Sequence, residues 1–241
     1  MDEIAVEQSI NAPPPPVEAN ADVITIINSI IDSLDSEQTK ELIENTNTQP
    51  QTGVDFPIDI IKVDPDDFDL IDVDGRQKKI VKIKDKYCST VSLSQVIEDG
   101  IWSIEIQFAN DGETGGIGIV EDSYSVPIGA RPEQNPDCRH MASYHGPSWY
   151  PGRVCCKGRN KSGNELFTDN QIIKAEYDSE KGTLIFFVDG VQQPVYVTGI
   201  KEKIRFIIFM FYGGGTCTIQ SLKKITSPTT MNVSNENALQ W

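Results

Sequence analysis

The chain contains thiol and imidazole side chains close enough in sequence to suggest metal binding or thiol catalysis: Cys138, His140, His145, Cys155 and Cys156. Thiolates and imidazoles are ligands that zinc prefers, and a thiol activated by an imidazole is a common nucleophile. The spacings match no zinc template, and adjacent residues of a strand point to opposite faces, so Cys155 and Cys156 cannot both reach one ion. No local motif places a cysteine beside a histidine. We therefore expect neither a metal site nor a catalytic thiol.

Two acidic segments suggest calcium binding, namely Asp64-Pro65-Asp66-Asp67 and Asp72-Val73-Asp74-Gly75. A calcium loop of the EF-hand type aligned on Gly75 needs oxygen ligands where the chain has Leu70 and Val81, so the template fails. We interpret both segments as strand edges or turns.

The glycine-rich segments also fail as phosphate-binding loops. Residues 112–118 lack the Gly-Lys-Ser/Thr ending, and they lead into an expected strand, whereas a phosphate loop leads into a helix. Gly213-Gly214-Gly215 lies between two expected strands and indicates a hairpin or a close backbone approach. With no catalytic motif in the chain, we predict a protein that is not an enzyme and that needs no cofactor or metal.

A binding function is the remaining expectation. The fifty or so residues between the strand that ends at Val120 and the strand that begins at Gln171 are rich in aromatic, arginine and proline residues. Such side chains on loops that a rigid scaffold supports are typical of interaction surfaces. The alternative is that the aromatic residues only pack the loops down. We predict that a protein or peptide partner contacts six residues: Arg131, Tyr144, His145, Trp149, Tyr150 and Tyr212.

The elements that must position these residues are strands. Between residues 171 and 178, Ile173, Ala175 and Tyr177 alternate with Lys174 and Glu176, the period-two pattern of a half-buried strand. A polar turn follows, and then an apolar run over 184–188 typical of an inner strand. Asp189-Gly190 predicts a two-residue hairpin turn, since both residues tolerate a positive φ.

Further strands are expected along the rest of the chain. Trp102, Ile104, Ile106 and Phe108 alternate with polar residues and should share a buried face. Similar short patterns occur at 80–84, 89–93, 117–121, 140–145, 153–157, 193–197, 204–212 and 216–222. Many short strands separated by turn signals indicate an all-β protein, an antiparallel β-sandwich.

Several motifs resemble the signature of the SPRY domain family, in the right order along the chain: Asp99-Gly100-Ile101-Trp102-Ser103-Ile104-Glu105, Ile117-Gly118-Ile119-Val120, Tyr177-Asp178, Gly182-Thr183-Leu184, Phe186-Phe187, Asp189-Gly190 and Cys217-Thr218-Ile219. The chain departs from the family pattern at Met141-Ala142-Ser143 and at Asp169-Asn170-Gln171-Ile172. The resemblance implies a SPRY sandwich of the lectin-like jelly-roll type.

The same resemblance implies a non-catalytic interaction module, an adaptor that takes a short peptide or protein loop through loops at one end of the sandwich. It does not transfer named contact residues, because members differ in these loops. The alternative is a carbohydrate-binding domain, since the sandwich is similar to that of legume-type lectins. Asp169, Asn170 and Trp149 are the pieces of such a site that this sequence offers.

Charge is distributed unevenly and bears on the choice of partner. The net charge is −15, and residues 1–74 hold 18 acidic against 2 basic residues. Nucleic acid is not expected to bind, because phosphate contacts need clustered Lys and Arg. No apolar run is long enough to span a membrane and no secretory signal opens the sequence, so we expect a cytoplasmic protein with reduced cysteines.

Three regions are predicted. Residues 1–53 form an acidic, Pro-containing, partly helical extension and linker, residues 54–228 form the sandwich, and residues 229–241 form a flexible tail. Within the extension, residues 22–44 have a helical pattern with one apolar stripe: Val23, Ile27, Ile30 and Leu34. This helix either packs against the sandwich or contacts a partner.

Overall fold

A computed structural model describes residues 53–61, 64–85, 88–110, 114–147 and 151–241. The chain divides into two units, Met1–Pro50 and Gln51–Trp241, and all described residues belong to the second. The predicted helix at 22–44 and almost all of the predicted extension therefore lie outside the described residues.

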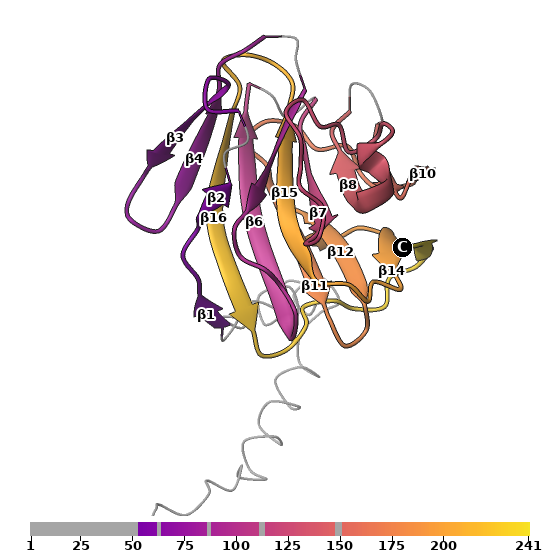
Figure 1. Ribbon diagram of the computed structural model, residues 1–241. Helices are drawn as coiled ribbons and strands as arrows, with labels where there is room; N and C mark the ends of the chain where they lie inside the picture. Colours follow the sequence, from indigo (N-terminus) through magenta and orange to yellow (C-terminus); the bar gives the residue numbers. More distant parts are fainter. Residues whose placement is uncertain (1–52, 62–63, 86–87, 111–113, 148–150) are drawn as a thin grey trace, which may run out of the picture. The chain divides into compact units, whose positions relative to one another are not determined.

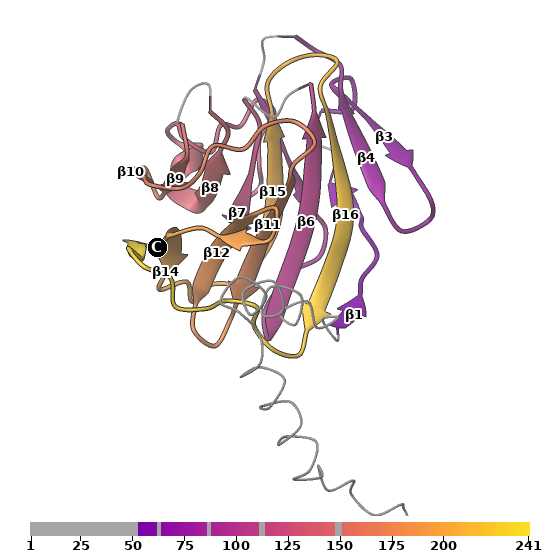
Figure 2. The same cartoon turned by 180° about the vertical axis from the view of Figure 1, so that it is seen from behind.

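The described residues form two stacked, mostly antiparallel sheets (Figures 1 and 2). The first sheet contains, in spatial order, β17 (Asn237–Gln240), β14 (Val195–Thr198), β12 (Thr183–Val188), β11 (Ile172–Asp178), β6 (Ile101–Ala109), β16 (Thr216–Ile225), β4 (Lys78–Lys82) and β3 (Phe68–Asp72), with β1 (Gly53–Asp55) on β16 and β13 (Val191–Gln192) on β12. The second contains β10 (Arg159–Ser162), β9 (Arg153–Cys156), β8 (Met141–His145), β7 (Gly116–Glu121), β15 (Ile204–Met210), β5 (Ser89–Leu93) and β2 (Ile60–Ile61). The predicted all-β sandwich is confirmed.

The core lies between the sheets, where alternate side chains of the central strands meet. Trp102, Ile104, Ile106 and Phe108 of β6 are buried, as their spacing predicts. The neighbouring strand β11 aligns with β6 so that Tyr177 lies opposite Trp102, and its inward residues belong to the same cluster. The period-two pattern therefore identified the inner face of both strands.

The outer face of β11 differs from the prediction of a half-buried strand. Lys174 and Glu176 are also buried, because the segment after β16 lies across them. Thr229 donates its backbone N–H to Glu176 at 2.8 Å, and Lys174 donates to the Thr229 hydroxyl at 2.5 Å. The Lys174 ammonium also lies 3.7 Å from the centroid of the Phe187 ring. Both faces of β11 are therefore covered, one by apolar and one by polar contacts.

Turn chemistry explains two of the hairpins. Asp189 and Gly190 connect β12 to β13 with φ values of 47° and 81°, the left-handed pair that a two-residue hairpin needs. Between β3 and β4, Asp72 accepts the N–H of Gly75 at 2.7 Å and Asp74 accepts those of Arg76 and Gln77. The acidic segment at 72–75 is thus a turn, as interpreted, in which carboxylates cap backbone donors.

The structure excludes the hairpin that was one of two alternatives predicted for Gly213-Gly214-Gly215. The segment connects β15 of the second sheet to β16 of the first, so it crosses between sheets and forms no hairpin. A Cβ atom on Gly213 would lie 2.7 Å from the carbonyl oxygen of Ile83. The close backbone approach is the reason for glycine at this position.

The C-terminal residues also differ from the prediction, which made 229–241 a flexible tail. Strand β17 pairs in parallel with β14, and Leu239 packs into the core. The Trp241 indole N–H donates to Glu202 at 2.7 Å, and Arg159 of β10 donates to the carbonyl of Gln240. Polar contacts to residues far away in sequence hold this segment, and such contacts leave no local pattern.

A buried ion pair joins the two sheets. The Lys82 ammonium of β4 donates to both carboxylate oxygens of Asp67, at 2.6 and 2.8 Å, and to the Lys84 carbonyl. Asp67 also accepts the Ser89 hydroxyl of β5 and the N–H of Lys84. Both side chains of the pair are 0% exposed. Since every donor of the ammonium and both carboxylate oxygens have partners, the pair can lie in the interior.

Removing one partner should strongly destabilise the fold. We expect Lys82→Met to lower the free energy of unfolding by roughly 3–5 kcal/mol, because it leaves the Asp67 carboxylate buried without its counter-ion. The double variant Lys82→Met/Asp67→Asn should recover part of the lost free energy of unfolding, since it removes the buried charge. Urea denaturation followed by tryptophan fluorescence measures both variants.

The matched control is the exposed pair of the same strand, Lys78 with Asp72, at 2.7 Å and with side chains 30% and 52% exposed. Lys78→Met should change stability by less than about 1 kcal/mol. Equal losses for Lys78→Met and Lys82→Met would show that the buried pair has no special role.

Candidate functional site

The connection between β7 and β8, residues 122–140, carries the first of the predicted contact residues. Its apolar side chains Val126 and Ala130 pack on the outer face of the second sheet, against Val120, Met141 and Ile207. The Thr90 hydroxyl of β5 donates to the Ala130 carbonyl at 2.7 Å. This long loop is therefore fixed to the sheet at the residue that precedes Arg131.

Polar contacts then fix Arg131 itself. Its backbone N–H donates to Asp137 at 3.0 Å, and its guanidinium donates to Glu133 at 2.8 Å. Asp137 begins the short 3-10 helix η1 (Asp137–His140) and also accepts the Tyr124 hydroxyl at 2.6 Å. Burial, together with that hydrogen bond, raises the pKa of Tyr124 to about 12. The Arg131 side chain is 25% exposed, so the loop presents a guanidinium in a defined position.

A small cavity shows which segments meet beside Arg131. Its volume is about 20 Å³, room for one water molecule. Three separate connections and the ends of strands contribute to its lining, which consists of Cys88, Thr114, Arg131, Glu133, His145, Phe209 and Phe211. Thr114, Arg131 with Glu133, and Phe211, which belong to three different connections, therefore meet at one end of the sandwich. We call the group Thr114, Arg131, Glu133 and Tyr212 the loop end.

Tyr212 lies on the connection between β15 and β16. Its side chain is 39% exposed, and its ring lies edge-on to that of Phe211, with centroids 5.1 Å apart. Phe211 lines the cavity, and Tyr212 is the next residue of the chain. A partner contact by Tyr212 stays a prediction. Trp149 and Tyr150 lie outside the described residues, and their contacts stay a prediction.

Tyr144 is a correction to the predicted set. It belongs to β8, opposite Ile117, and its side chain is fully buried in the core. The ring packs against Phe167 and Phe186, and the hydroxyl donates to the Glu165 carbonyl. Burial raises the pKa of Tyr144 above its ordinary value. Tyr144 supports the fold, and its side chain is not accessible to a partner.

His145 is also buried and cannot contact a partner directly. Its Nε2 atom lies 2.8 Å from the Ser143 hydroxyl, and its ring centroid lies 4.7 Å from that of Phe209. Burial, with a smaller effect of the Arg131 charge, lowers the pKa of His145 to about 3. The imidazole is therefore neutral near pH 7 and forms part of the floor beneath Arg131.

Sequence reasoning missed Glu133, Thr114 and Phe211 as neighbours of Arg131. The pairing of Glu133 with Arg131 has a weak local signal, because the opposite charges stand two residues apart. Thr114 and Phe211 come from other connections, so only the sheet order brings them to this place.

Cys155 and Cys156 are neighbours on β9 and are both buried. Cys156 faces the core, whereas Cys155 points to the other face of β9, as expected for adjacent strand residues. Burial raises the pKa of Cys155 to about 12 and that of Cys156 to about 11, so both thiols are protonated at neutral pH. Among the described residues, no three His, Cys, Asp or Glu side chains gather as metal ligands.

The two described residues of the carbohydrate alternative have structural roles. Asp169 accepts the backbone N–H of Asn110 at 2.7 Å. Asn170 has a φ of 68°, and its carbonyl accepts the Gln107 side chain at 2.6 Å. Both residues shape the connection from β10 to β11. The carbohydrate reading stays a prediction without support from these contacts.

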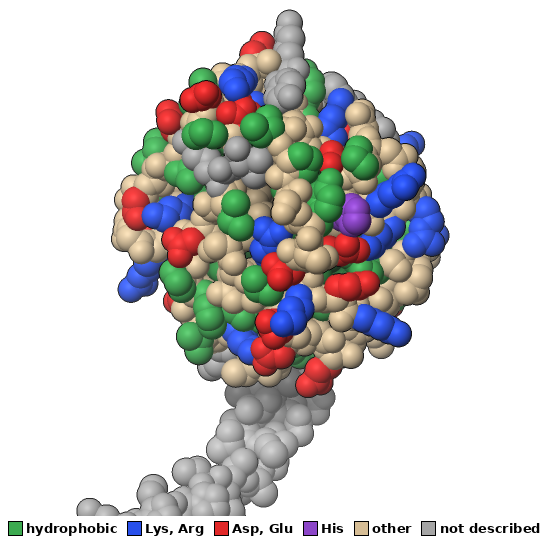
Figure 3. Space-filling model, in the orientation of Figure 1, with side chains coloured by type: hydrophobic (Ala, Val, Ile, Leu, Met, Phe, Trp, Pro, Cys, Tyr) green, Lys and Arg blue, Asp and Glu red, His purple; other side chains and the backbone are tan. Residues whose placement is uncertain are grey.

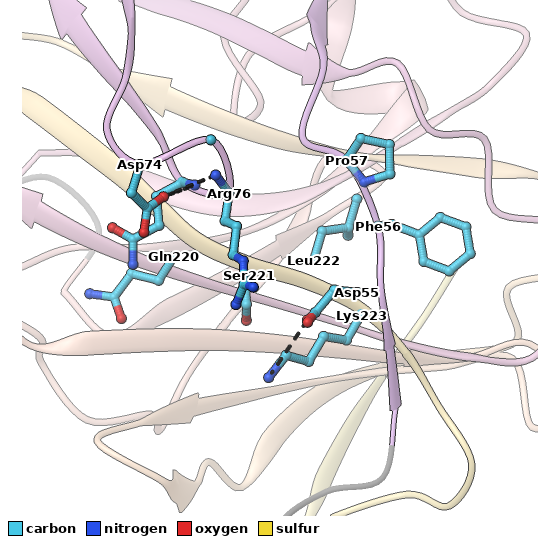
Figure 4. A pocket seen from close by; sticks show the side chains of 11 residues that line it. Asp55, Phe56, Pro57, Asp74, Arg76, Gln220, Ser221, Leu222 and Lys223 are labelled. Carbon is cyan, nitrogen blue, oxygen red and sulfur yellow. Dashed lines mark hydrogen bonds and ion pairs between the residues drawn. The ribbon is translucent and has the colours of Figure 1, made fainter.

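A second hollow lies at the edge of the first sheet, away from the predicted residues. It has a volume of about 520 Å³ and lies between the β3–β4 turn, the segment after β1, and residues 220–223 of β16 (Figure 4). It forms because β4 pairs with β16 up to Ile219 and β1 pairs from Lys223, with a bulge between these two stretches. Asp55 and Lys223 face each other across 4.0 Å.

Charged side chains of both signs are interspersed on the face shown in Figure 3. Within the part of the chain that the structure describes, no helix has both the length and the apolar character to cross a bilayer.

Comparison with solved structures relates this fold to known proteins. The TRIM65 PSpry domain superposes with a TM-score of 0.52 at 11% identity, covering 68% of this chain and 89% of that chain. The SPRY domain of human HERC1 gives 0.49 at 13% identity, covering 68% and 99%, and stonustoxin gives 0.48 at 11%, covering 68% and 27%. No protein-family model and no curated protein matches the sequence. The likeness to TRIM65 agrees with the SPRY-type sandwich that the sequence motifs predict.

The buried His145 should make stability depend on pH. An unfolded histidine has a pKa of about 6.5, and the folded value is about 3. The unfolded state therefore binds the proton first as the pH falls, so stability is full above about pH 6.5 and decreases below it. At pH 5 this one group should have lowered the free energy of unfolding by about 2 kcal/mol.

Urea denaturation at pH 7, 6 and 5 measures this slope. His145→Gln should flatten it. An unchanged slope in His145→Gln would mean that His145 takes up protons in the folded state.

Proposed function

We propose that this chain, which has the SPRY fold, is a non-catalytic protein-interaction module that binds a short peptide or protein loop at the loop end. The observation that carries the proposal is the convergence of three connections on one supported place. There the partly exposed Arg131 lies beside Glu133 and Thr114, and the exposed Tyr212 follows Phe211 in the chain. The resemblance of the motifs to SPRY domains supports the same role. The buried free thiols fit a reducing compartment such as the cytoplasm.

The physical basis of binding is a surface that is ordered before the partner arrives. Glu133 holds the guanidinium of Arg131, and Thr90 holds the loop at Ala130, so little side-chain entropy remains to be lost on binding. Arg131 carries a guanidinium, a group that recognises backbone carbonyls and carboxylates of peptides. Tyr212 offers a flat apolar ring with a polar end, the type of residue that dominates binding energy in interfaces.

An unbiased peptide library presented to the full chain would supply the ligand for the test. We expect Arg131→Ala and Tyr212→Ala each to weaken binding of the selected peptide by roughly 1–3 kcal/mol, because each removes an anchor of the surface. Isothermal titration calorimetry measures the affinities, and thermal melting shows that the folds are intact.

Lys203→Ala is the matched control. Lys203 is an exposed cation that precedes β15, so it lies at the opposite end of that strand from Tyr212, and it pairs with Glu98 at 2.6 Å. It should leave peptide binding unchanged. If Arg131→Ala and Tyr212→Ala keep full affinity and Lys203→Ala loses it, the partner binds at the other end of the sandwich and the proposal is wrong.

A further inference from the structure

Strand β3 is the free edge of the first sheet. It pairs with β4, and no other described strand lies beyond it (Figures 1 and 2). Three apolar side chains on or next to it are exposed, Leu70 at 37%, Ile71 at 48% and Val73 at 51%. An exposed edge strand with apolar side chains is a template for pairing with another strand.

Three other outermost strands of the two sheets, β10, β2 and β17, are short or polar. Strand β10 has the polar sequence Arg159-Asn160-Lys161-Ser162, and β2 has only two residues. At the opposite edge of the first sheet, β17 has four residues, and Arg159 and Lys161 donate to it. Short length and polar side chains are the usual protection of sheet edges. Among these strands β3 exposes the longest apolar stretch, whereas β2 exposes Ile61 alone, at 42%.

The hydrogen bonds around β3 show which backbone groups point outward. The N–H of Ile83 donates to the Asp67 carbonyl at 2.8 Å, and the N–H of Val73 donates to the Gln77 carbonyl at 3.1 Å. Residues of an antiparallel strand bond alternately to either side, so Asp69 and Ile71 also bond to β4. The N–H and C=O groups of Leu70, with those of Phe68 and Asp72, therefore point away from the sheet.

Charge decides what kind of strand fits this edge. Asp72 is paired with Lys78 at 2.7 Å. Asp69, on the same face as Ile71 and Val73, is exposed and forms no ion pair among the described residues. An opposite charge directly across an antiparallel pair is stabilising, and a like charge is destabilising. An added strand is thus favoured by Lys or Arg opposite Asp69 and by an aliphatic residue opposite Leu70, the next residue, whose side chain lies on the other face.

Two other occupants fit the edge less well. The chain's own residues 1–52 contain ten acidic residues and one lysine, so they bring the wrong charge. A second copy of β3 would bring its own Asp69 and Asp72 to an edge that already carries both. We propose that the β3 edge binds an extended segment of another protein in which basic and aliphatic residues alternate, adding a strand to the first sheet.

The test uses two synthetic peptides of equal length, one alternating lysine with valine and one alternating glutamate with valine, added to the isotope-labelled full chain. We expect the lysine peptide to perturb the amide resonances of Leu70 and Asp72, and the glutamate peptide to leave them unchanged. Asp69→Lys should weaken the lysine peptide at least tenfold and make the glutamate peptide the better ligand. Glu180→Lys, the same charge reversal on the exposed β11–β12 turn, should change neither.

Leu70→Pro separates pairing from simple charge attraction. Proline at position 70 removes an outward N–H, while the bonds that Asp69 and Ile71 make to β4 remain. It should abolish binding of the lysine peptide without changing the far-ultraviolet circular dichroism spectrum. Asp69→Lys keeps the proposal testable if Leu70→Pro does not fold.

Three outcomes would overturn the proposal. Binding of the lysine peptide that is equal in wild type, Asp69→Lys and Leu70→Pro would show that the edge is not used. A dimer in sedimentation that Leu70→Pro dissolves would assign the edge to a second copy. Protection of the Leu70 amide in the free monomer, lost on deleting residues 1–52, would assign it to the chain's own N-terminal segment.

Discussion

The ion pair between Lys82 and Asp67 is the constraint on which this end of the molecule depends. Two charges in the interior are tolerated only when each polar atom has a partner, and the partners here come from the Asp64–Asp67 turn, β4, the connection after it, and β5. These segments therefore have one acceptable arrangement. The next residue of β5, Thr90, holds the carbonyl of Ala130, and Arg131 follows it directly. Through Ser89, Thr90 and Ala130, the position of the Arg131 guanidinium is thus linked to the Asp67 charge in the core.

This arrangement explains how a loop of about twenty residues can serve as a defined surface. Long connections in compact domains are usually functional or variable. Here the connection from β7 to β8 has its own apolar cluster on the outer face of the second sheet, and Asp137 joins its two ends through Tyr124 and the N–H of Arg131. Side chains at its tip can differ between proteins without disturbing these anchors, so one scaffold can present different contact residues.

The sequence was sufficient for the fold where one face of a strand is apolar and the other is polar. The alternation in β6 and β11 identified the inner face of each strand. The Asp189-Gly190 pair identified the turn between β12 and β13, because both residues adopt the positive φ that such a turn needs. It was not sufficient at β8, where all five residues are buried, so nothing in the pattern showed that Tyr144 points inward. The sequence pattern also failed to predict β17, because side chains distant in sequence, Arg159, Lys161 and Glu202, hold this strand in place. It failed at the loop end as well, because Thr114 and Phe211 meet Arg131 only through the order of the strands in the sheets.

The pairing of β6 with β16 has a consequence for how the chain reaches its native state. These adjacent central strands align Ile101 with Ile225, and Gln220 bonds to Gln107 across 113 positions of sequence. The entropy of closing so long a loop must be met before the contacts can form, which makes such topologies slow to fold. Until β16 arrives, the apolar face of β6 lacks a neighbour on one side. The first sheet therefore cannot be divided into an early and a late half, and a fragment that ends before β16 would expose a central strand to aggregation.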